Sequence, residues 1–146
     1  MRITQEADYA IRICCVLDDA GDKLGTAEIS VRAGVPQRFA LKILRTLLQA
    51  GIVRSIVGNI GGYALDTDGA TLTVVRIIEA IDGPICISKC MDGDYDCTRN
   101  PVKSYCKMHV AFCCVSKLIK EKLNQITVRT LTDSAVGTTV VAQITK

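Results

Sequence analysis

Several kinds of residue are scarce in this sequence, and each shortage excludes a class of protein. The 146 residues include no tryptophan, and aromatic residues make up 4%, too few for a single-strand binding surface built from stacked aromatic rings. Although 49% of the residues are apolar, no uninterrupted apolar run reaches the roughly 18 residues that a membrane span needs. The polar N-terminus also lacks the order of a signal peptide. We therefore expect a cytosolic (cytoplasmic) protein that has no membrane partner.

Catalytic motifs are scarce as well. The chain has one histidine, His109, and neither a glycine-rich phosphate loop nor a nucleophile–base pattern, so we expect no enzymatic activity. Cysteine, by contrast, is abundant, with eight residues. Without an export signal these cysteines are expected to be reduced thiols rather than a disulfide framework. Their number requires a reason in packing, metal binding or redox chemistry.

Acidic residues are absent from residues 29–65, and this shortage points to a partner. The net charge of the whole chain is only +3. The acid-free segment nevertheless carries five basic side chains, namely Arg32, Arg38, Lys42, Arg45 and Arg54. Such a segment suits a polyanion, and a double-stranded DNA operator is the expected partner.

Apolar periodicity predicts a mainly α fold with one small β-hairpin. Spacings of three and four predict helices over residues 4–19, 26–33, 36–50, 71–81 and 104–124, with Thr26 and Ser104 as N-caps. Residues 52–57 and 63–65, joined by a glycine-rich turn, predict a hairpin. Two helices joined by a tight turn at Gly34 and followed by a hairpin describe a winged helix-turn-helix. Residues 85–103 show no period and predict a long irregular loop, and no role is assigned to the weakly patterned segment from Thr127.

The predicted helix 36–50 has one polar face, which carries Arg38, Lys42, Arg45 and Gln49. A solvated surface is the ordinary explanation of such a face. Its place in a helix-turn-helix, inside the acid-free segment, favours recognition of the major groove instead. The predicted DNA contacts in the helix and in the following wing are Gln37, Arg38, Lys42, Arg45, Arg54, Asn59 and Gly61.

The predicted helix 104–124 carries a regular apolar seam formed by Met108, Phe112, Val115, Ile119, Leu123 and Ile126. This seam could pack on its own domain or pair with a second copy of the chain. We favour pairing, because helix-turn-helix proteins commonly use dimers to meet two half-sites. The long C-terminal helix is therefore predicted to form a homodimer.

Three cysteines and the one histidine fall in a single loop-to-helix stretch. Cys90, Cys97, Cys106 and His109 have the spacing C-x6-C-x8-C-x2-H. Thiolates with an imidazole suit an iron–sulfur cluster or zinc, but the close cysteine pairs of structural zinc sites are missing. A thiol switch without metal stays open. The other five cysteines are assigned to packing. Cys113 is a reserve ligand, because it lies four residues after His109, and Cys86 stays open as a ligand, because it is nearer the loop.

At this point the chain resembles the bacterial winged-helix regulators of the IscR, NsrR and CymR type. The resemblance rests on the order of several short motifs and covers about residues 1–133. They are Met1-Arg2-Ile3-Thr4, Asp8-Tyr9-Ala10-Ile11-Arg12, Ala50-Gly51-Ile52-Val53-Arg54-Ser55, Gly61-Gly62-Tyr63-Ala64-Leu65, the three-cysteine loop and Ile126-Thr127-Val128-Arg129-Thr130-Leu131. It implies a homodimeric transcription factor that senses iron–sulfur, nitric oxide or redox status through a bound cluster.

The resemblance also implies a ligand set. Cys90, Cys97 and Cys106 match the three cysteine ligands of the family, and His109 matches the histidine of the IscR-type [2Fe–2S] site. Asp8 matches the carboxylate that is supplied across the dimer to an NsrR-type [4Fe–4S] site. A carboxylate paired with a helix dipole is the ordinary alternative for Asp8. A second possibility of the same fold is a metal-free or zinc-bound regulator controlled by a protein partner or by thiol oxidation.

These expectations divide the chain into four parts. Residues 1–83 are predicted to form the DNA-binding domain and residues 84–103 the cluster-binding loop. Residues 104–133 are predicted to form the dimerisation helix and its cap, and residues 134–146 a tail.

Overall fold

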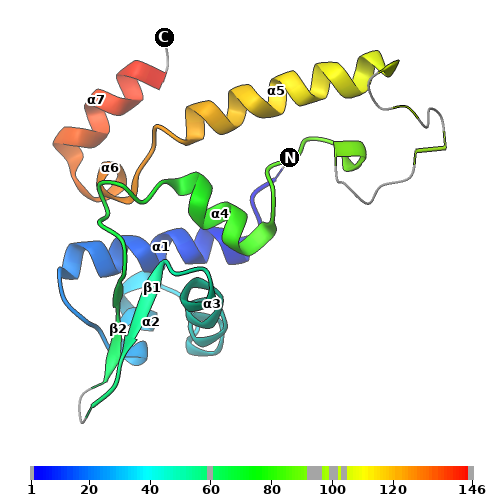
Figure 1. The fold of residues 1–146 in the computed structure, drawn as a ribbon. Coiled ribbons are helices and arrows are strands. Elements are labelled where there is room, and N and C mark those ends of the chain that lie inside the picture. Colours follow the sequence, from blue (N-terminus) through cyan, green and yellow to red (C-terminus); the bar gives the residue numbers. More distant parts are fainter. Residues whose placement is uncertain (1, 59–60, 92–96, 99–101, 103–104, 145–146) are drawn as a thin grey trace.

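The structure, a computed structural model, describes residues 2–58, 61–91, 97–98, 102 and 105–144 (Figure 1). Its elements in chain order are α1 (Gln5–Ala20), α2 (Thr26–Ala33), α3 (Gln37–Gln49), β1 (Val53–Ile56), β2 (Gly62–Leu65), α4 (Val74–Asp82), the 3-10 turn η1 (Lys89–Met91), α5 (Lys107–Leu123), α6 (Val128–Thr132) and α7 (Ser134–Ile144). The mainly helical architecture with one hairpin confirms the predicted fold class. No helix among the described residues is long and apolar enough to cross a membrane.

The first three helices form the helix-turn-helix, and α1 is the element on which the others pack. Thr4 caps α1, because its hydroxyl accepts a hydrogen bond from the N–H of Ala7 at 3.2 Å. The turn between α2 and α3 depends on Gly34, which has a φ of +64° that side chains rarely adopt. The predicted N-cap Thr26 is wrong by one position. Gly25 occupies the cap, and Thr26 is the first helical residue.

The hairpin forms the wing and is tied to the body through the start of β2. Strands β1 and β2 are antiparallel, with Val53 opposite Leu65 and Ile56 opposite Gly62. Tyr63 also exchanges two backbone hydrogen bonds of 2.9 Å with Leu24, which precedes α2. Glycine is required at position 62, because a Cβ there would lie 2.6 Å from the carbonyl oxygen of Leu24. The start of the wing is therefore held in one place.

One main core joins α1, α2, α3, the hairpin and the start of α4. The largest fully buried side chains of this core are Ile13, Ile29, Ile43, Leu44, Leu47, Ile52, Leu72 and Ile77. On α1, Ile13 is fully buried, whereas Ile11 is half-buried. We call α1–α4, the hairpin and α6 the body of the molecule.

The weakly patterned segment from Thr127 folds into two further helices. Thr127 and Thr130 form a reciprocal capping box at the start of α6. The backbone N–H of Val128 donates to the carbonyl of Leu72 at 2.9 Å, and the Val128 side chain is fully buried in the main core. The chain thus returns to the body after α5, which sequence periodicity did not indicate.

Helix α5 and the turn η1 form an arm that leaves the body. Figure 1 shows α5 projecting beyond α4, with η1 near its far end. Helix α5 begins at Lys107 after Cys106 in the N-cap position, and the predicted cap Ser104 lies outside the described residues. Of the predicted apolar seam, Ile119 and Leu123 pack against α4, whereas Met108 and Val115 are about half exposed at 50% and 44%.

Candidate nucleic-acid interface and metal centre

The polar face of α3 lies on the surface, as predicted. Gln37, Arg38, Lys42 and Arg45 are all exposed, while the opposite face of the helix contributes Ile43, Leu44 and Leu47 to the core. This arrangement follows from the helical period, because residues three and four apart share a face. The helix that follows the turn thus presents a row of basic side chains to solvent.

Two of these basic side chains have partners within the chain. The Nζ atom of Lys42 lies 2.6 Å from the Oε1 atom of Glu6, near the start of α1. The guanidinium of Arg38 lies over the ring of Phe39, 4.9 Å from its centre. Although residues 29–65 contain no acidic residue, α1 therefore places a carboxylate beside Lys42 in the folded chain.

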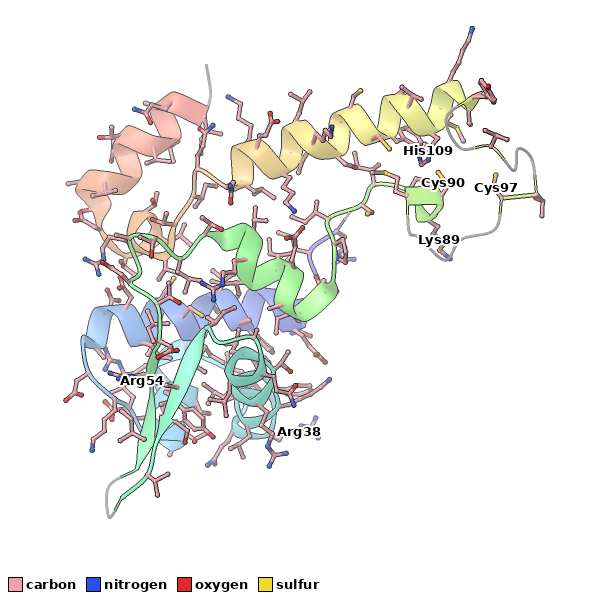
Figure 2. The ribbon with its side chains drawn as sticks, in the orientation of Figure 1. Arg38, Arg54, Lys89, Cys90, Cys97 and His109 are labelled. Atoms are coloured by element: carbon pink, nitrogen blue, oxygen red, sulfur yellow. The ribbon has the colours of Figure 1, made fainter. Side chains whose placement is uncertain are left out.

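The wing presents one basic and one apolar side chain. Arg54 on β1 is exposed, and Figure 2 shows it on the side of the hairpin away from Arg38. Val57, which precedes the turn, is 96% exposed, and Gly61 is also exposed. The predicted contact Asn59 lies outside the described residues.

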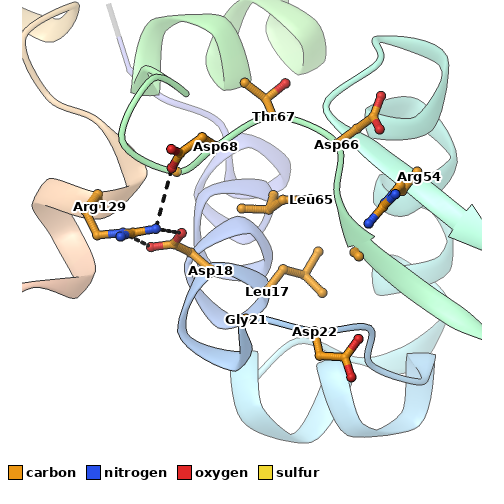
Figure 3. Close-up of a pocket in the computed structure, with 12 residues that line it drawn as sticks. Leu17, Asp18, Gly21, Asp22, Arg54, Leu65, Asp66, Thr67, Asp68 and Arg129 are labelled. Carbon is orange, nitrogen blue, oxygen red and sulfur yellow. Dashed lines mark hydrogen bonds and ion pairs between the residues drawn. The ribbon is translucent and has the colours of Figure 1, made fainter.

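A cleft of about 380 Å³ lies between the end of α1, the wing and α6, and Arg54 lines it (Figure 3). Asp18 stands on one wall and accepts two hydrogen bonds of 2.8 Å from the guanidinium of Arg129 and one of 2.9 Å from Thr132. These hydrogen bonds hold the pKa of Asp18 below its ordinary value, against the opposing effect of burial. Arg129 also lies 3.6 Å from Asp68. The Asp18–Arg129 pair thus joins α6 to α1.

The cysteines of the loop are brought to the far end of the arm. Cys90 lies in η1, where its thiol is 3.2 Å from the hydroxyl of Ser88, and Cys97 and Cys106 are half-buried. Figure 2 shows Cys90 on the side of α5 that carries His109, with Cys97 farther along the loop. In the part of the chain that the structure describes, no three histidine, cysteine or acidic side chains are gathered closely enough to hold a metal ion.

The ring of His109 has two different environments. Its Nε2 atom lies 3.4 Å from the sulfur of Cys113, one helical turn later. Its Nδ1 atom is buried and has no hydrogen-bond partner among the described residues. Buried polar atoms are nearly always hydrogen-bonded in folded proteins, so an unpartnered one requires an explanation, and a bound ion is one of the recognised explanations.

Ser116 fastens the loop to the helix, and the sequence reasoning missed it. This residue is only 4% exposed. Its hydroxyl accepts from the N–H of Ile87 at 3.2 Å and lies 3.4 Å from the sulfur of Met91. Ser116 lies seven residues after His109 and therefore on the same helix face. This spacing is the feature of the sequence that could have identified it.

Asp8 is engaged elsewhere in the chain. Its carboxylate forms an ion pair of 2.8 Å with Arg12, and its side chain is about half exposed. Asp8 lines a surface groove with Arg2 and Gln5. Within the described residues it does not join the cysteines of the loop.

Two other cysteines lie in the body. Cys14 is fully buried in the main core, and burial raises the pKa of its thiol. Burial, with smaller contributions from Asp19 and Asp18, raises the pKa of Cys15 to about 11. Both side chains are therefore protonated thiols near neutral pH, and Cys14 packs as a small apolar residue.

Comparison with known proteins gives a consistent set of matches. The family model Rrf2, described as an iron-dependent transcriptional regulator, matches residues 3–134. The regulator IscR of Vibrio vulnificus (strain YJ016) is 30% identical over 129 residues, which cover 87% of this chain and 74% of that protein. Protein aau3 of Rhizobium meliloti (strain 1021) is 29% identical over 113 residues, which cover 76% of this chain and 71% of that protein.

Solved structures match over most of the chain. The IscR structure of T. potens has a TM-score of 0.71 at 20% identity and covers 92% of this chain and 88% of its own. The structure of CymR, the global cysteine regulator of B. subtilis, has a TM-score of 0.69 at 21% identity and covers 90% and 96%. At such identities the likeness shows the fold, which is the winged helix of these regulators.

Proposed function

The chain belongs to the Rrf2 family of transcriptional regulators, and from this premise we propose that it is a homodimeric DNA-binding regulator that senses iron–sulfur, nitric oxide or redox status through an iron–sulfur cluster. The observation that carries the sensing part is the buried, unpartnered Nδ1 atom of His109 on the helix that faces the cysteine-bearing turn. A bound cluster would supply reversible electron transfer and reactivity toward small oxidants.

The proposed DNA contacts lie on α3 and the wing. They are Gln37, Arg38, Lys42, Arg45, Arg54, Asn59 and Gly61. Two observations support the proposal. The members of this set that lie on α3 are all exposed, and the chain belongs to a family of transcriptional regulators. Helix α3 would enter the major groove, and the wing would lie along the backbone or minor groove.

The proposed dimer interface is on α5. All 17 residues of this helix are described, and Ser116 alone among them is buried. Its exposed apolar side chains are Met108, Val110, Val115 and Leu118. Met108, Val115 and Leu118 share one side of the helix at spacings of seven and three, and an exposed apolar surface of this kind is typical of an interface between subunits. The division into residues 1–83, 84–103, 104–133 and 134–146 stays a proposal.

The proposed cluster ligands are Cys90, Cys97 and Cys106, with His109 or an Asp8 contributed across the dimer as the fourth. Three thiols and an imidazole fit the donor preferences of iron in a [2Fe–2S] or [4Fe–4S] cluster. The buried Nδ1 atom fits the same role. The similarity to IscR of V. vulnificus supports this assignment.

Anaerobic purification with quantified iron and acid-labile sulfide per chain tests the proposal. We expect visible charge-transfer bands and sulfide in the wild type and in the control Cys114→Ala, whose cysteine is exposed on α5, and their loss in Cys97→Ala. Comparison of His109→Ala with Asp8→Ala then identifies the fourth ligand. A colourless protein without sulfide, even after reconstitution, would contradict cluster sensing.

The second candidate is a metal-free or zinc-bound regulator controlled by thiol oxidation or by a protein partner. The contact between Cys113 and His109, which places a thiol 3.4 Å from the imidazole, favours it. The likeness to CymR structures, one of them an oxidized form from Staphylococcus aureus, supports the same candidate. A colourless protein whose DNA affinity changes after mild peroxide treatment would favour it over the cluster.

A further inference from the structure

We infer that His109 binds the metal of this site through Nδ1, and that Cys113 is the positioning residue that holds the ring by its Nε2 atom. The inference rests on the proposed function and deepens it, because it assigns the ligating atom and adds a residue outside the matched ligand set. It depends only on described residues of η1 and α5.

The geometry on α5 separates the two ring nitrogens by role. His109 and Cys113 are one helical turn apart, and the sulfur of Cys113 lies 3.4 Å from Nε2. The Nδ1 atom points away from this contact and is buried without a hydrogen-bond partner among the described residues. One nitrogen is therefore engaged within the helix, and the other is available to a ligand.

A ligating histidine has a requirement that this arrangement meets. When one ring nitrogen binds a metal, the other carries the proton and donates it to a second group, which sets the tautomer and the orientation of the ring. Here the sulfur of Cys113 is the acceptor within reach of Nε2. With the proton on Nε2, the Nδ1 atom keeps its lone pair and is able to bind a metal.

The cysteine-bearing turn is held on the same face of α5. Ser116, seven residues after His109, accepts a hydrogen bond from Ile87 and contacts Met91. Cys90 lies between these two anchored residues, and Figure 2 shows it on the side of the helix that carries His109. An imidazole nitrogen and a thiol are thus presented from two elements that Ser116 fastens together, which suits iron in a cluster.

The single histidine of the chain permits a direct test of the ligating atom. Protein is prepared with histidine carrying ¹⁵N at Nδ1 only or at Nε2 only, reconstituted anaerobically and reduced. Pulsed electron paramagnetic resonance then measures the ¹⁵N hyperfine coupling. We expect a strong coupling with the Nδ1 label and a weak one with the Nε2 label. A strong Nε2 coupling, or none from either label in a protein that holds sulfide, would overturn the inference and leave the proposed function standing.

Cluster stability tests the role of Cys113, with the adjacent Cys114 as the matched control. Loss of a group that positions a metal ligand typically weakens binding about 10- to 100-fold. We expect Cys113→Ala to hold a cluster that a chelator removes about tenfold faster, and Cys113→Ser to recover part of the difference. Cys114→Ala should behave as wild type. Complete absence of the cluster in Cys113→Ala would make Cys113 a ligand itself and refute the positioning role, as would equal rates in both alanine variants.

The cluster-free protein tests the contact independently of any metal. Nuclear magnetic resonance of the labelled histidine, at a pH where the ring is neutral, reports which nitrogen carries the proton. We expect the Nε2–H tautomer in wild type and Cys114→Ala, and a mixture of tautomers in Cys113→Ala. A dominant Nδ1–H tautomer in the wild type would refute the inference. Absence of sulfide after reconstitution, with the expected tautomer present, would instead refute cluster sensing itself.

Discussion

The body and the arm contain similar apolar residues but bury them to very different extents. In the body, side chains such as Leu44 and Ile77 are fully or almost fully buried among neighbouring elements. On the arm, Leu118 is 59% exposed and Met108 is 50% exposed. Full burial of a leucine side chain contributes about 1.5–3 kcal/mol, so the body is stabilised from within, while much of the arm's apolar surface remains available to a partner.

This contrast in packing agrees with the functions that we propose for the two regions. A region with complete packing keeps its shape whether or not a ligand is present, which a surface for DNA requires. A region with few buried contacts has low local stability and responds to what binds it. The arm also holds the His109 ring with its unpartnered nitrogen. The proposed sensor site thus lies in the incompletely packed region, and the proposed DNA-binding surface lies in the completely packed one.

The largest expected effect is on the free energy of unfolding, when the same leucine-to-alanine change is made in the body and in the arm. Leu44→Ala should lower the free energy of unfolding by about 2–5 kcal/mol, because it leaves a cavity in the main core. Leu118→Ala removes the same atoms from a side chain that is 59% exposed within one subunit, so it should change the free energy of unfolding of the separate subunit by less than about 0.5 kcal/mol. Denaturant unfolding, repeated over a range of protein concentrations, separates folding from association. Equal losses in the two variants would contradict the contrast.

A smaller effect on stability is expected where α6 contacts α1. The Asp18 side chain is only 6% exposed and accepts three hydrogen bonds from Arg129 and Thr132. Asp18→Asn should lower the free energy of unfolding by about 1–3 kcal/mol, since charged hydrogen bonds are lost in a nearly buried site. The exposed neighbour Asp19 provides the control Asp19→Asn, which should leave stability close to that of the wild type.

The pH dependence of this effect has a defined sign. Arg129 lowers the pKa of Asp18 in the folded state, so folding favours the ionised carboxylate. The advantage of the wild type over Asp18→Asn should be complete above the ordinary aspartate pKa. It should shrink as the pH falls through the lower pKa of folded Asp18. Unfolding curves at several acidic pH values measure it, and a gap that grows on acidification would refute the assignment.

The sequence predicted the body better than it predicted the return of the chain to it. Helices α1 and α3 follow a clear apolar period, and their glycine and proline boundaries are local signals. Helices α6 and α7 lack such a period because they are rich in threonine, valine and alanine. Helix α6 depends on tertiary contacts, namely the burial of Val128 and the pairing of Arg129 with Asp18. The pair of Arg129 with Asp18 joins residues 111 positions apart, and contacts between distant residues leave no local pattern.

The candidate sites divide in the same way. The exposed face of α3 is a property of one helix, and its period predicted it. The contact between Lys42 and Glu6 joins two helices across 36 positions. The sequence around Lys42 contains no acidic residue, so local composition could not indicate that the fold brings Glu6 beside it. On the arm, residue spacing identified His109 and suggested Cys113 as a reserve ligand, but the anchoring role of Ser116 requires the folded loop.

The smallest expected effect concerns Glu6, the acid that lies beside the proposed DNA-binding surface. Arg38→Ala should weaken DNA binding about fivefold, roughly 1 kcal/mol, and reduce the salt slope by about one. Lys42→Ala should have a smaller effect, because Glu6 already offsets part of its charge at 2.6 Å. Unchanged salt slopes in both variants would remove α3 from the interface.

Glu6→Gln isolates this contribution, because it removes the acid and leaves Lys42 in place. An exposed ion pair contributes at most about 1 kcal/mol, so stability should hardly change, while affinity for DNA of any sequence should rise up to about fivefold. Fluorescence anisotropy at several salt concentrations, with specific and unrelated duplexes, measures both. If Glu6 acts only by restraining Lys42, the double variant Glu6→Gln, Lys42→Ala should bind as weakly as Lys42→Ala alone. Tighter binding by the double variant would show that Glu6 repels the DNA backbone directly.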